Sequence, residues 1–208
     1  MKRFGKNVRG LFLRLLPAPE CHLCHHKFEL TQTAKPRLWC NKCFEHLLDE
    51  QAALCPRCGL PSKNAPNICT KCLASPPPWD RLYCISDYQS PLKSYIQQFK
   101  HQRAFWLAPN LAALLAHKIP QIAPILIPVP LHWRRLGWRG FNQSEYLATA
   151  LRKHFICHHS QKSHLCNKLV MRQAATASQQ GLNLKQRQIN LKQAFRLTQP
   201  IAFKHVAI

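Results

Sequence analysis

Four C-x-x-C pairs of identical spacing constrain the fold of this 208-residue chain more than any other feature. Each pair places two thiolates on one tight turn, and two such turns facing each other supply the four-sulfur tetrahedron that zinc prefers. We therefore predict structural zinc, one or two ions per chain, in place of disulfides, which are rare in cytosolic proteins. Neighbouring turns pair most simply in sequence order, although the spacing leaves a cross-braced arrangement open. The predicted ligands are Cys21, Cys24, Cys40, Cys43, Cys55, Cys58, Cys69 and Cys72.

Three histidines beside the first pair are alternative ligands, namely His22, His25 and His26. Because eight thiolates suffice for two four-sulfur sites, we expect these histidines to be solvated. Four thiolates leave no open position for a catalytic water, so the module is predicted to be structural or a docking surface. The remaining thiols are predicted to be ordinary and partly buried. They are Cys84, Cys157 and Cys166.

The chain is strongly basic, and its charge is uneven. Thirty lysines and arginines against eight acidic residues give a formal net charge of +22. From Gln89 onward, 17 basic residues accompany a single acid, Glu145. Such a charge favours polyanionic partners, namely nucleic acid, phosphorylated metabolites or anionic membrane surfaces. No run of 18 apolar residues exists, so we predict no transmembrane segment and expect a cytoplasmic protein.

Hydrophobic periodicity and proline positions divide the chain into four predicted segments. Residues 1–19 are predicted to form a basic amphipathic helix, and residues 20–74 a double zinc ribbon. Three consecutive prolines within residues 75–80 predict an extended linker. Residues 81–208 alternate between strand and helix patterns, which predicts an α/β domain with a mainly parallel sheet.

Within the last segment, apolar runs predict strands at residues 81–88, 124–130 and 203–208. Helical spacing predicts helices at residues 91–101, at 108–119 with Pro109 in the first turn, and from Ser144 to about His154 with Ser144 as the cap. A basic loop is expected between the second strand and the last of these helices.

Two basic stretches are candidate binding segments. The expected loop after the 124–130 strand carries three arginines between a strand and a helix start, where phosphate is commonly bound. These are Arg134, Arg135 and Arg139. The second stretch is polar and predicted to be mobile, leads into a short helix from about Asn183, and is interpreted as either a closing flap or a linker. Its candidate residues are Arg172, Thr176, Gln179 and Arg187.

Together, the four C-x-x-C turns, "IPVPLHWRRLGWRGFNQSEYLA" and "RQAATASQQGLNLKQRQINLKQAF" resemble the ComF/GntX family over nearly the whole chain. The resemblance implies a double zinc ribbon followed by a type I phosphoribosyltransferase-like domain. It also implies a role in natural competence, in processing imported single-stranded DNA or in DNA utilisation, with DNA-processing proteins as partners. By the same resemblance Arg139, Asn142 and Gln143 lie in or beside a pyrophosphate-side loop, and residues 172–179 form the flap.

The family pattern continues beyond the segment equivalent to "KHVAI" with V-D-D-V-x-T-T-G-x-T, whose acids bind ribose hydroxyls or magnesium. This sequence stops before that segment, and Glu145 is its only carboxylate side chain after Asp87. We therefore expect a carboxyl-truncated domain that binds magnesium and phosphoribosyl pyrophosphate only if the segment is restored. Catalysis by this polypeptide is not expected.

Three hypotheses follow. The first is a competence-associated, phosphoribosyltransferase-like zinc protein that is inactive as this chain. The second is a zinc-ribbon adaptor for single-stranded nucleic acid, with base stacking on Trp133, Trp138 and Phe141. The third is a phosphoribosyltransferase whose last segment is lost through a frameshift or an early stop.

Overall fold

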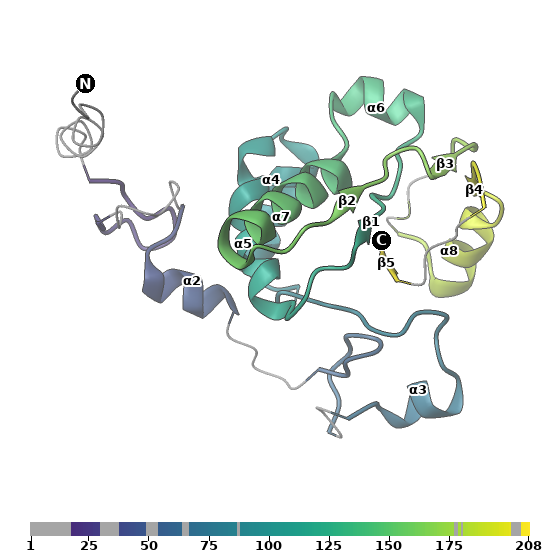
Figure 1. Cartoon of the computed structure of the whole chain (residues 1–208), viewed down its shortest axis with the longest axis horizontal. Coiled ribbons are helices and arrows are strands. Elements are labelled where there is room, and N and C mark those ends of the chain that lie inside the picture. Colours follow the sequence, from purple (N-terminus) through teal and green to yellow (C-terminus); the bar gives the residue numbers. More distant parts are fainter. Residues whose placement is uncertain are drawn as a thin grey trace, which may run out of the picture. The chain divides into compact units, whose positions relative to one another are not determined.

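A computed structural model describes residues 18–29, 38–48, 54–63, 67–86, 88–176, 179, 181–200 and 205–208 (Figure 1). The chain forms two compact units, Met1–Gln51 and Ala52–Ile208. Of the amphipathic helix predicted over residues 1–19, all but the last two residues lie outside the described part. The division falls between the second and third C-x-x-C pairs, and the four segment boundaries given by the sequence remain predictions.

The described residues of the first unit include a turn that carries Cys21 and Cys24 and a helix that carries Cys43. An antiparallel bridge between Glu20 and Lys27 closes the first turn, in which the backbone N–H of Cys21 donates to the carbonyl of His26. Helix α2, Asn41–Leu48, begins directly after Cys40 and turns Leu47 inward. Among its described residues, the largest fully buried side chain is that of Trp39.

The amino-terminal part of the second unit repeats this arrangement. Leu54 and Pro61 form the closing bridge, and helix α3, Thr70–Ala74, begins directly after Cys69. Gly59 follows the second cysteine of its turn, as His25 follows Cys24, and both residues have positive φ (70° and 60°). Both turns therefore reverse the chain at the same position.

The predicted linker folds back on this second turn. Arg57 donates from Nε to the carbonyl of Trp79 at 3.1 Å, and Trp79 returns a bond from its indole N–H to the carbonyl of Arg57 at 2.7 Å. The backbone N–H of Leu82 donates to the carbonyl of Pro56. These bonds hold residues 77–82 against the turn that carries Cys55 and Cys58.

The α/β part of the second unit contains helices α4 (Leu92–His101), α5 (Ala108–Lys118), α6 (Trp133–Arg139), α7 (Gln143–His159) and α8 (Leu184–Leu191), with a short 3-10 helix, η1 (Phe105–Leu107). Strands β1 (Ile125–Leu126), β2 (His164–Leu165) and β5 (Val206–Ala207) form a parallel sheet in the order β2-β1-β5. Strands β3 (Val170–Arg172) and β4 (Phe195–Leu197) pair antiparallel. The α/β class and the parallel sheet predicted from the sequence are confirmed.

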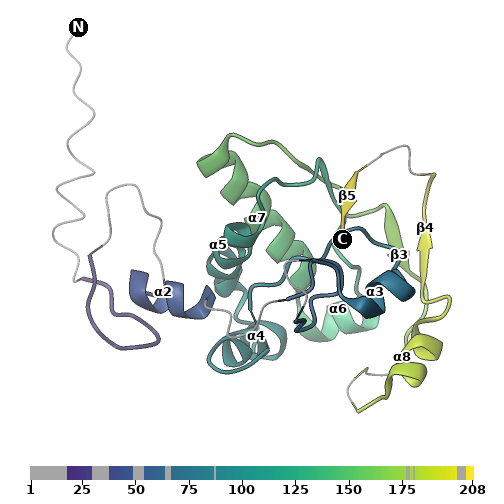
Figure 2. The ribbon, with the colours of Figure 1, turned by 90° about the horizontal axis from the view of Figure 1, so that it is seen from below.

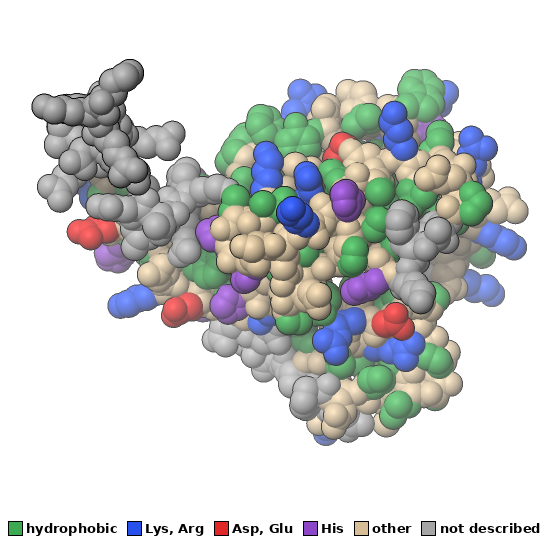
Figure 3. All heavy atoms as spheres, viewed as in Figure 1, with side chains coloured by type: hydrophobic (Ala, Val, Ile, Leu, Met, Phe, Trp, Pro, Cys, Tyr) green, Lys and Arg blue, Asp and Glu red, His purple; other side chains and the backbone are tan. Residues whose placement is uncertain are grey.

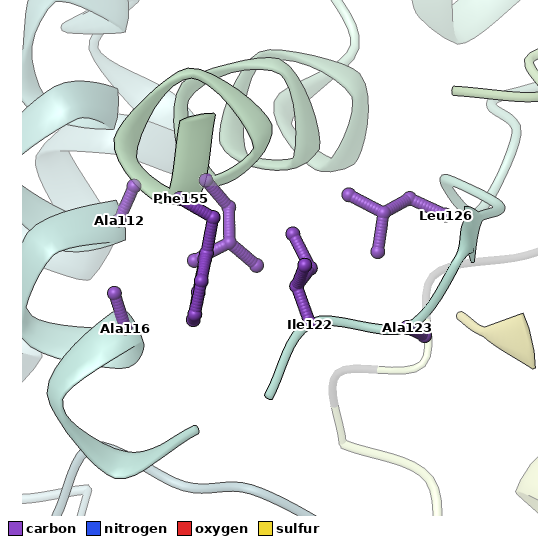
Figure 4. Packing of buried hydrophobic residues seen from close by; sticks show 7 residues of the cluster. Ala112, Ala116, Ile122, Ala123, Leu126 and Phe155 are labelled. Carbon is purple, nitrogen blue, oxygen red and sulfur yellow. The ribbon is translucent and has the colours of Figure 1, made fainter. Parts of the chain in front are cut away.

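The main core lies where α5 packs on α7. Ala112 and Ala116 are four residues apart on α5, and their small side chains let α7 approach closely. Figure 2 shows α5 and α7 side by side. The Phe155 ring, which is fully buried, lies between these alanines and Ile122 (Figure 4). Burying a phenylalanine side chain contributes roughly 1.5–3 kcal/mol, so this contact fixes α7 relative to the sheet.

Several predicted elements were wrong in detail. Residues 81–86 and 88 form no strand, because this segment packs on the second turn instead of joining a ladder. The expected basic loop contains helix α6, whose start is capped by the His132 ring and whose end is set by Gly140 with φ 81°. Helix α7 begins one residue earlier than expected, and Asn142, not Ser144, is its cap.

The antiparallel β3–β4 pair was not predicted at all. It brings together the two ends of a connection that includes α8, and Figure 1 and Figure 2 both show these three elements grouped apart from α5 and α7. We call residues 170–197 the flap segment. Helix α8 itself starts at the expected place, with Asn183 and Gln186 forming a capping box.

Candidate functional site

Two groups of four cysteines are the first candidate site. In each group all four Sγ atoms lie within 4.8 Å of one another, and two of the four residues are buried. Cysteines neighbouring in the chain pair as the simpler prediction had it, without cross-bracing. The groups are Cys21, Cys24, Cys40 and Cys43, and Cys55, Cys58, Cys69 and Cys72.

The spacing of the sulfur atoms fits a tetrahedral metal ion. A tetrahedron with metal–sulfur bonds of about 2.3 Å has sulfur–sulfur edges of about 3.8 Å. The Sγ atoms of Cys24 and Cys40 are 3.8 Å apart, and those of Cys58 and Cys69 are 3.9 Å apart. Both groups can therefore hold one metal ion without rearrangement of the backbone.

Backbone N–H groups donate hydrogen bonds that stabilise one thiolate in each group. The N–H of Cys40 donates to Sγ of Cys21 at 3.3 Å, and the N–H of Cys69 donates to Sγ of Cys55 at 3.4 Å. Burial by itself raises the pKa of Cys21, but the backbone donors outweigh it and lower that pKa to about 6. The N–H of Cys69 likewise lowers the pKa of Cys55 to about 6.

The opposite member of each group behaves in the opposite way. Burial, with thiol hydrogen bonds from its neighbours, raises the pKa of Cys72 to about 12. The same causes raise the pKa of Cys43 well above its ordinary value. Without a metal, each group therefore holds protons that a cation must displace.

The three histidines and the three remaining cysteines agree with the sequence prediction except at one cysteine. The three histidines beside the first turn are exposed, as expected, and none joins a four-cysteine group: His22, His25 and His26. Cys84 and Cys166 are half-buried as predicted, but Cys157 is exposed because it lies on the outer face of α7.

A cluster of three arginines is the second candidate site. Arg135 and Arg139 lie four residues apart on α6 and so share one face of that helix. Arg172 ends strand β3 in the flap segment. Thr176 joins the two elements, because Arg135 donates to its carbonyl at 3.0 Å and Arg172 donates to its hydroxyl at 2.5 Å.

The three positive charges act on one another. Partial burial lowers the pKa of Arg139, and the positive charge of Arg135 lowers it further. Arg172 is affected by the same two causes in the same order. Within the described part of the chain none of the three guanidinium groups bonds to a carboxylate. An anion placed among them would relieve this repulsion.

One buried donor at this cluster, and a second in the flap segment, lack a partner among the described residues. The Nε atom of Arg139 and the Nε2 atom of Gln179 are buried, and among the described residues neither has a hydrogen-bond acceptor. A buried donor without an acceptor costs about 1–3 kcal/mol. Unsatisfied donors among like charges are therefore what a site for a phosphate-sized anion would show.

Other residues named by the sequence have local partners. Asn142 accepts from Ser144 N–H and donates to the carbonyl of Val129 at 3.2 Å. Gln143 donates to the carbonyl of Lys100 and accepts from Arg139. The guanidinium of Arg134 lies over the Trp133 ring, and Arg187 of α8 donates to the carbonyl of Leu182, which precedes the helix.

An exposed aromatic and basic surface covers α6. This helix has no buried residue, and the side chains of Trp133 and Trp138 are 69% and 70% exposed. Arg103 anchors the end of α6 by donating to the carbonyl of Trp138 at 3.1 Å. Phe141 was also predicted to be available for base stacking; it is only 6% exposed, so that assignment was wrong.

Phe141 instead belongs to an aromatic cluster that sequence reasoning missed. Its ring lies 5.3 Å from that of Tyr146 and 6.2 Å from that of Phe105. Trp106 extends the cluster outward, with its ring 5.7 Å from Phe105 and its side chain exposed. The sequence signal that could have indicated this cluster was the dipeptide "FW", residues 105–106, shortly after the basic "HQR".

Figure 3 shows that lysine and arginine side chains outnumber acidic side chains on the face it displays.

Among the described residues, none of the helices has the length and apolar character that a membrane span requires.

No family model matches the chain, and no solved structure matches it. Among curated proteins, the chain is 38% identical over 164 residues to DNA utilization protein YhgH of Escherichia coli K12, covering 74% of this chain and 69% of that protein. It is 35% identical over 199 residues to the protein of the same name from Salmonella typhimurium LT2, covering 90% and 82%. It is 34% identical over 152 residues to competence protein F of Haemophilus influenzae, covering 69% and 63%.

Proposed function

Since the chain belongs to the family of DNA utilization protein YhgH and competence protein F, we propose that it acts in the handling of DNA. We propose further that its arginine cluster, Arg135, Arg139 and Arg172, binds the phosphate groups of a phosphorylated ribose such as phosphoribosyl pyrophosphate. This proposal departs from the sequence-based expectation that phosphoribosyl pyrophosphate binds only when the V-D-D segment is present. The two four-cysteine groups hold structural zinc in this proposal. They supply no open coordination position, so their contribution is to fold the two turns and the linker.

The observation that carries the phosphate site is the combination of uncompensated charge and unsatisfied donors. Arg135 and Arg172 both bond to Thr176, the charge of Arg135 acts on Arg139, and within the described chain none of the three guanidinium groups bonds to a carboxylate. Two buried N–H donors also have no acceptor among the described residues. Arginine binds phosphate through two parallel hydrogen bonds, and each such charge-assisted bond is about twice as strong as a neutral one. A pyrophosphate group offers enough oxygen atoms to satisfy both orphan donors and all three charges.

Magnesium has no evident place in this site. The ion prefers carboxylate and phosphate oxygens, and the contacts of the cluster among the described residues include no carboxylate. We therefore expect binding that does not require magnesium. Cytoplasmic location remains a prediction from the sequence.

Thermal unfolding of the zinc-loaded chain tests the phosphate site. Pyrophosphate or phosphoribosyl pyrophosphate at 100 times its dissociation constant stabilises by about 2.7 kcal/mol, which is a rise in melting temperature of about 5–10 °C for a unit of this size. Arg172→Gln is expected to abolish most of the rise, whereas Arg187→Gln, a matched control on α8, is expected to keep it. No stabilisation of the wild-type chain by either ligand at millimolar concentration would remove the proposal.

A second candidate function is single-stranded nucleic-acid binding by the α6 surface. The observation that favours it is a helix with no buried residue that presents Trp133 and Trp138 beside Arg134 and near Arg103. Bases stacked on aromatic side chains contribute about 1–3 kcal/mol each, and basic neighbours add attraction to the phosphates. This function needs neither the flap segment nor the orphan donors.

Fluorescence anisotropy with a labelled single strand separates the two candidates. Trp138→Ala is expected to weaken binding about 5- to 100-fold, and raising the salt concentration is expected to weaken it steeply. Trp79→Phe, an exposed tryptophan held by the second turn, is the control and is expected to bind normally. Arg172→Gln should affect the phosphate ligand more than the strand. Equal binding by Trp138→Ala and the wild type would exclude the α6 surface.

A further inference from the structure

Helix α7 ends in a turn rich in imidazole groups. His154 and His158 are four residues apart and therefore lie on one face of the helix. Their ring centroids are 4.5 Å apart, and the planes of the rings are inclined by 38°. His158 is exposed and His154 is half-buried, so an ion can reach the pair from solvent. Neither residue belongs to the four-cysteine groups or to the arginine cluster.

If one nitrogen of each ring points at a shared ion, the distance between the ring centres sets the angle that the two imidazoles make at that ion. A metal ion about 2.05 Å from a ring nitrogen, in the plane of the ring, lies about 3.2 Å from the centre of that ring. Two rings with centres 4.5 Å apart then subtend about 90° at the ion. That angle matches adjacent positions of a square-planar or octahedral ion, whereas tetrahedral zinc needs about 109°.

We propose that His154 and His158 form a surface site for Cu²⁺ or Ni²⁺, with the two imidazoles in adjacent positions. Nitrogen and oxygen ligands in square-planar or octahedral array suit these two ions, and imidazole is a ligand that both accept. The four-cysteine groups, with softer thiolates in tetrahedral array, keep zinc. The inference does not depend on the proposed phosphate or nucleic-acid function.

The position at the end of α7 supports a cation. The backbone carbonyls of the last helical turn give this end partial negative charge, which attracts positive ions within about one turn. His159 is a poorer third ligand, because its ring centre is 5.9 Å from that of His154 and the same geometry gives about 135°. Among the described residues, groups of three or more potential ligands within reach of one ion occur only at the cysteines. Water or a partner's side chain therefore completes the coordination.

Titration of the full, zinc-loaded chain with Ni²⁺, followed by calorimetry, tests this site. The wild type is expected to bind one ion. His158→Ala is expected to bind it about 10- to 100-fold more weakly, because loss of a direct ligand should weaken binding at least as much as loss of a residue that only orients a ligand. His159→Ala is the matched control on the same turn and should bind as the wild type does. Because His158 is exposed, its replacement leaves the fold intact.

Electron paramagnetic resonance with one equivalent of Cu²⁺ supplies a second readout. Hyperfine coupling from two imidazole nitrogens is expected in the wild type and in His159→Ala, but not in His158→Ala or His154→Ala. Zinc is measured before and after addition. The proposal is overturned if His158→Ala binds Ni²⁺ as tightly as the wild type, or if the added ion displaces zinc and shows only sulfur ligands.

Discussion

Replacing Asn142 by alanine is expected to destabilise the α/β part of the chain by about 2 kcal/mol. The Asn142 side chain makes two bonds that alanine cannot make. Its Oδ1 atom accepts from the N–H of Ser144 at 3.1 Å and so caps α7, and its Nδ2 atom donates to the carbonyl of Val129 at 3.2 Å. The second bond ties the start of α7 to the segment that follows β1.

The magnitude is the sum of two independent losses. Removal of an asparagine cap costs about 0.5–2 kcal/mol, and loss of one neutral hydrogen bond costs about 0.5–1.5 kcal/mol. Asn142→Asp separates the two contributions, because aspartate keeps the capping oxygen and loses only the donor to Val129. We expect Asn142→Asp to lie roughly midway between the wild type and Asn142→Ala, at about 1 kcal/mol.

Urea unfolding followed by circular dichroism measures the change, at constant free zinc so that metal binding stabilises every variant equally. The midpoint should fall in the order wild type, Asn142→Asp, Asn142→Ala, with an unchanged slope. The reasoning is refuted if Asn142→Ala unfolds at the wild-type midpoint, or if Asn142→Asp is as unstable as Asn142→Ala, since the cap would then contribute nothing.

Three further predictions concern the core, the metal sites and the linker. Phe155→Ala empties a fully buried position and is expected to cost about 3–5 kcal/mol in urea unfolding, with Phe155→Leu costing clearly less. Zinc binding at pH 7 should release at least two protons, because burial raises the pKa of Cys43 and Cys72 and keeps both protonated in the metal-free chain. Zinc affinity should therefore rise with pH, and calorimetry in buffers of different ionisation enthalpy counts the released protons. Arg57→Ala removes two hydrogen bonds to the linker and should speed proteolytic cleavage within residues 75–80, whereas unchanged cleavage would mean that the linker is held by other contacts.

The metal groups could be predicted because their geometry is local. A C-x-x-C turn brings two thiolates together whatever the rest of the chain does, and a helix beginning directly after the first cysteine of the next pair brings the other two. Sequential pairing follows from that repeated arrangement, which the spacing alone did not decide. Helices α5 and α8 were predicted for a similar reason, since Pro109 and Asn183 mark their starts in the sequence.

Elements that depend on distant contacts could not be predicted. Helix α6 was not predicted, because Trp133, Leu136 and Trp138 face solvent and a helix without a buried face shows no amphipathic period in the sequence. The 81–88 strand failed because Leu82 packs near Gly59 of the second turn, a use of apolar residues that looks like a strand in sequence. The β3–β4 pair joins residues far apart along the chain, and no local signal marks such a pair.

The segment "RGFNQ", residues 139–143, shows how a specific motif can contain few ligands. Gly140 ends α6 in a left-handed conformation that favours glycine, Phe141 packs against the Tyr146 ring, and Asn142 caps α7. Gln143 donates to a carbonyl of α4 and accepts from Arg139. Four of the five residues therefore build the joint between α6 and α7, and Arg139 alone keeps a buried donor with no acceptor in the described chain. The motif therefore positions one guanidinium, that of Arg139, within the electrostatic reach of Arg135. Changes at its other four positions should alter ligand affinity only as far as they move Arg139.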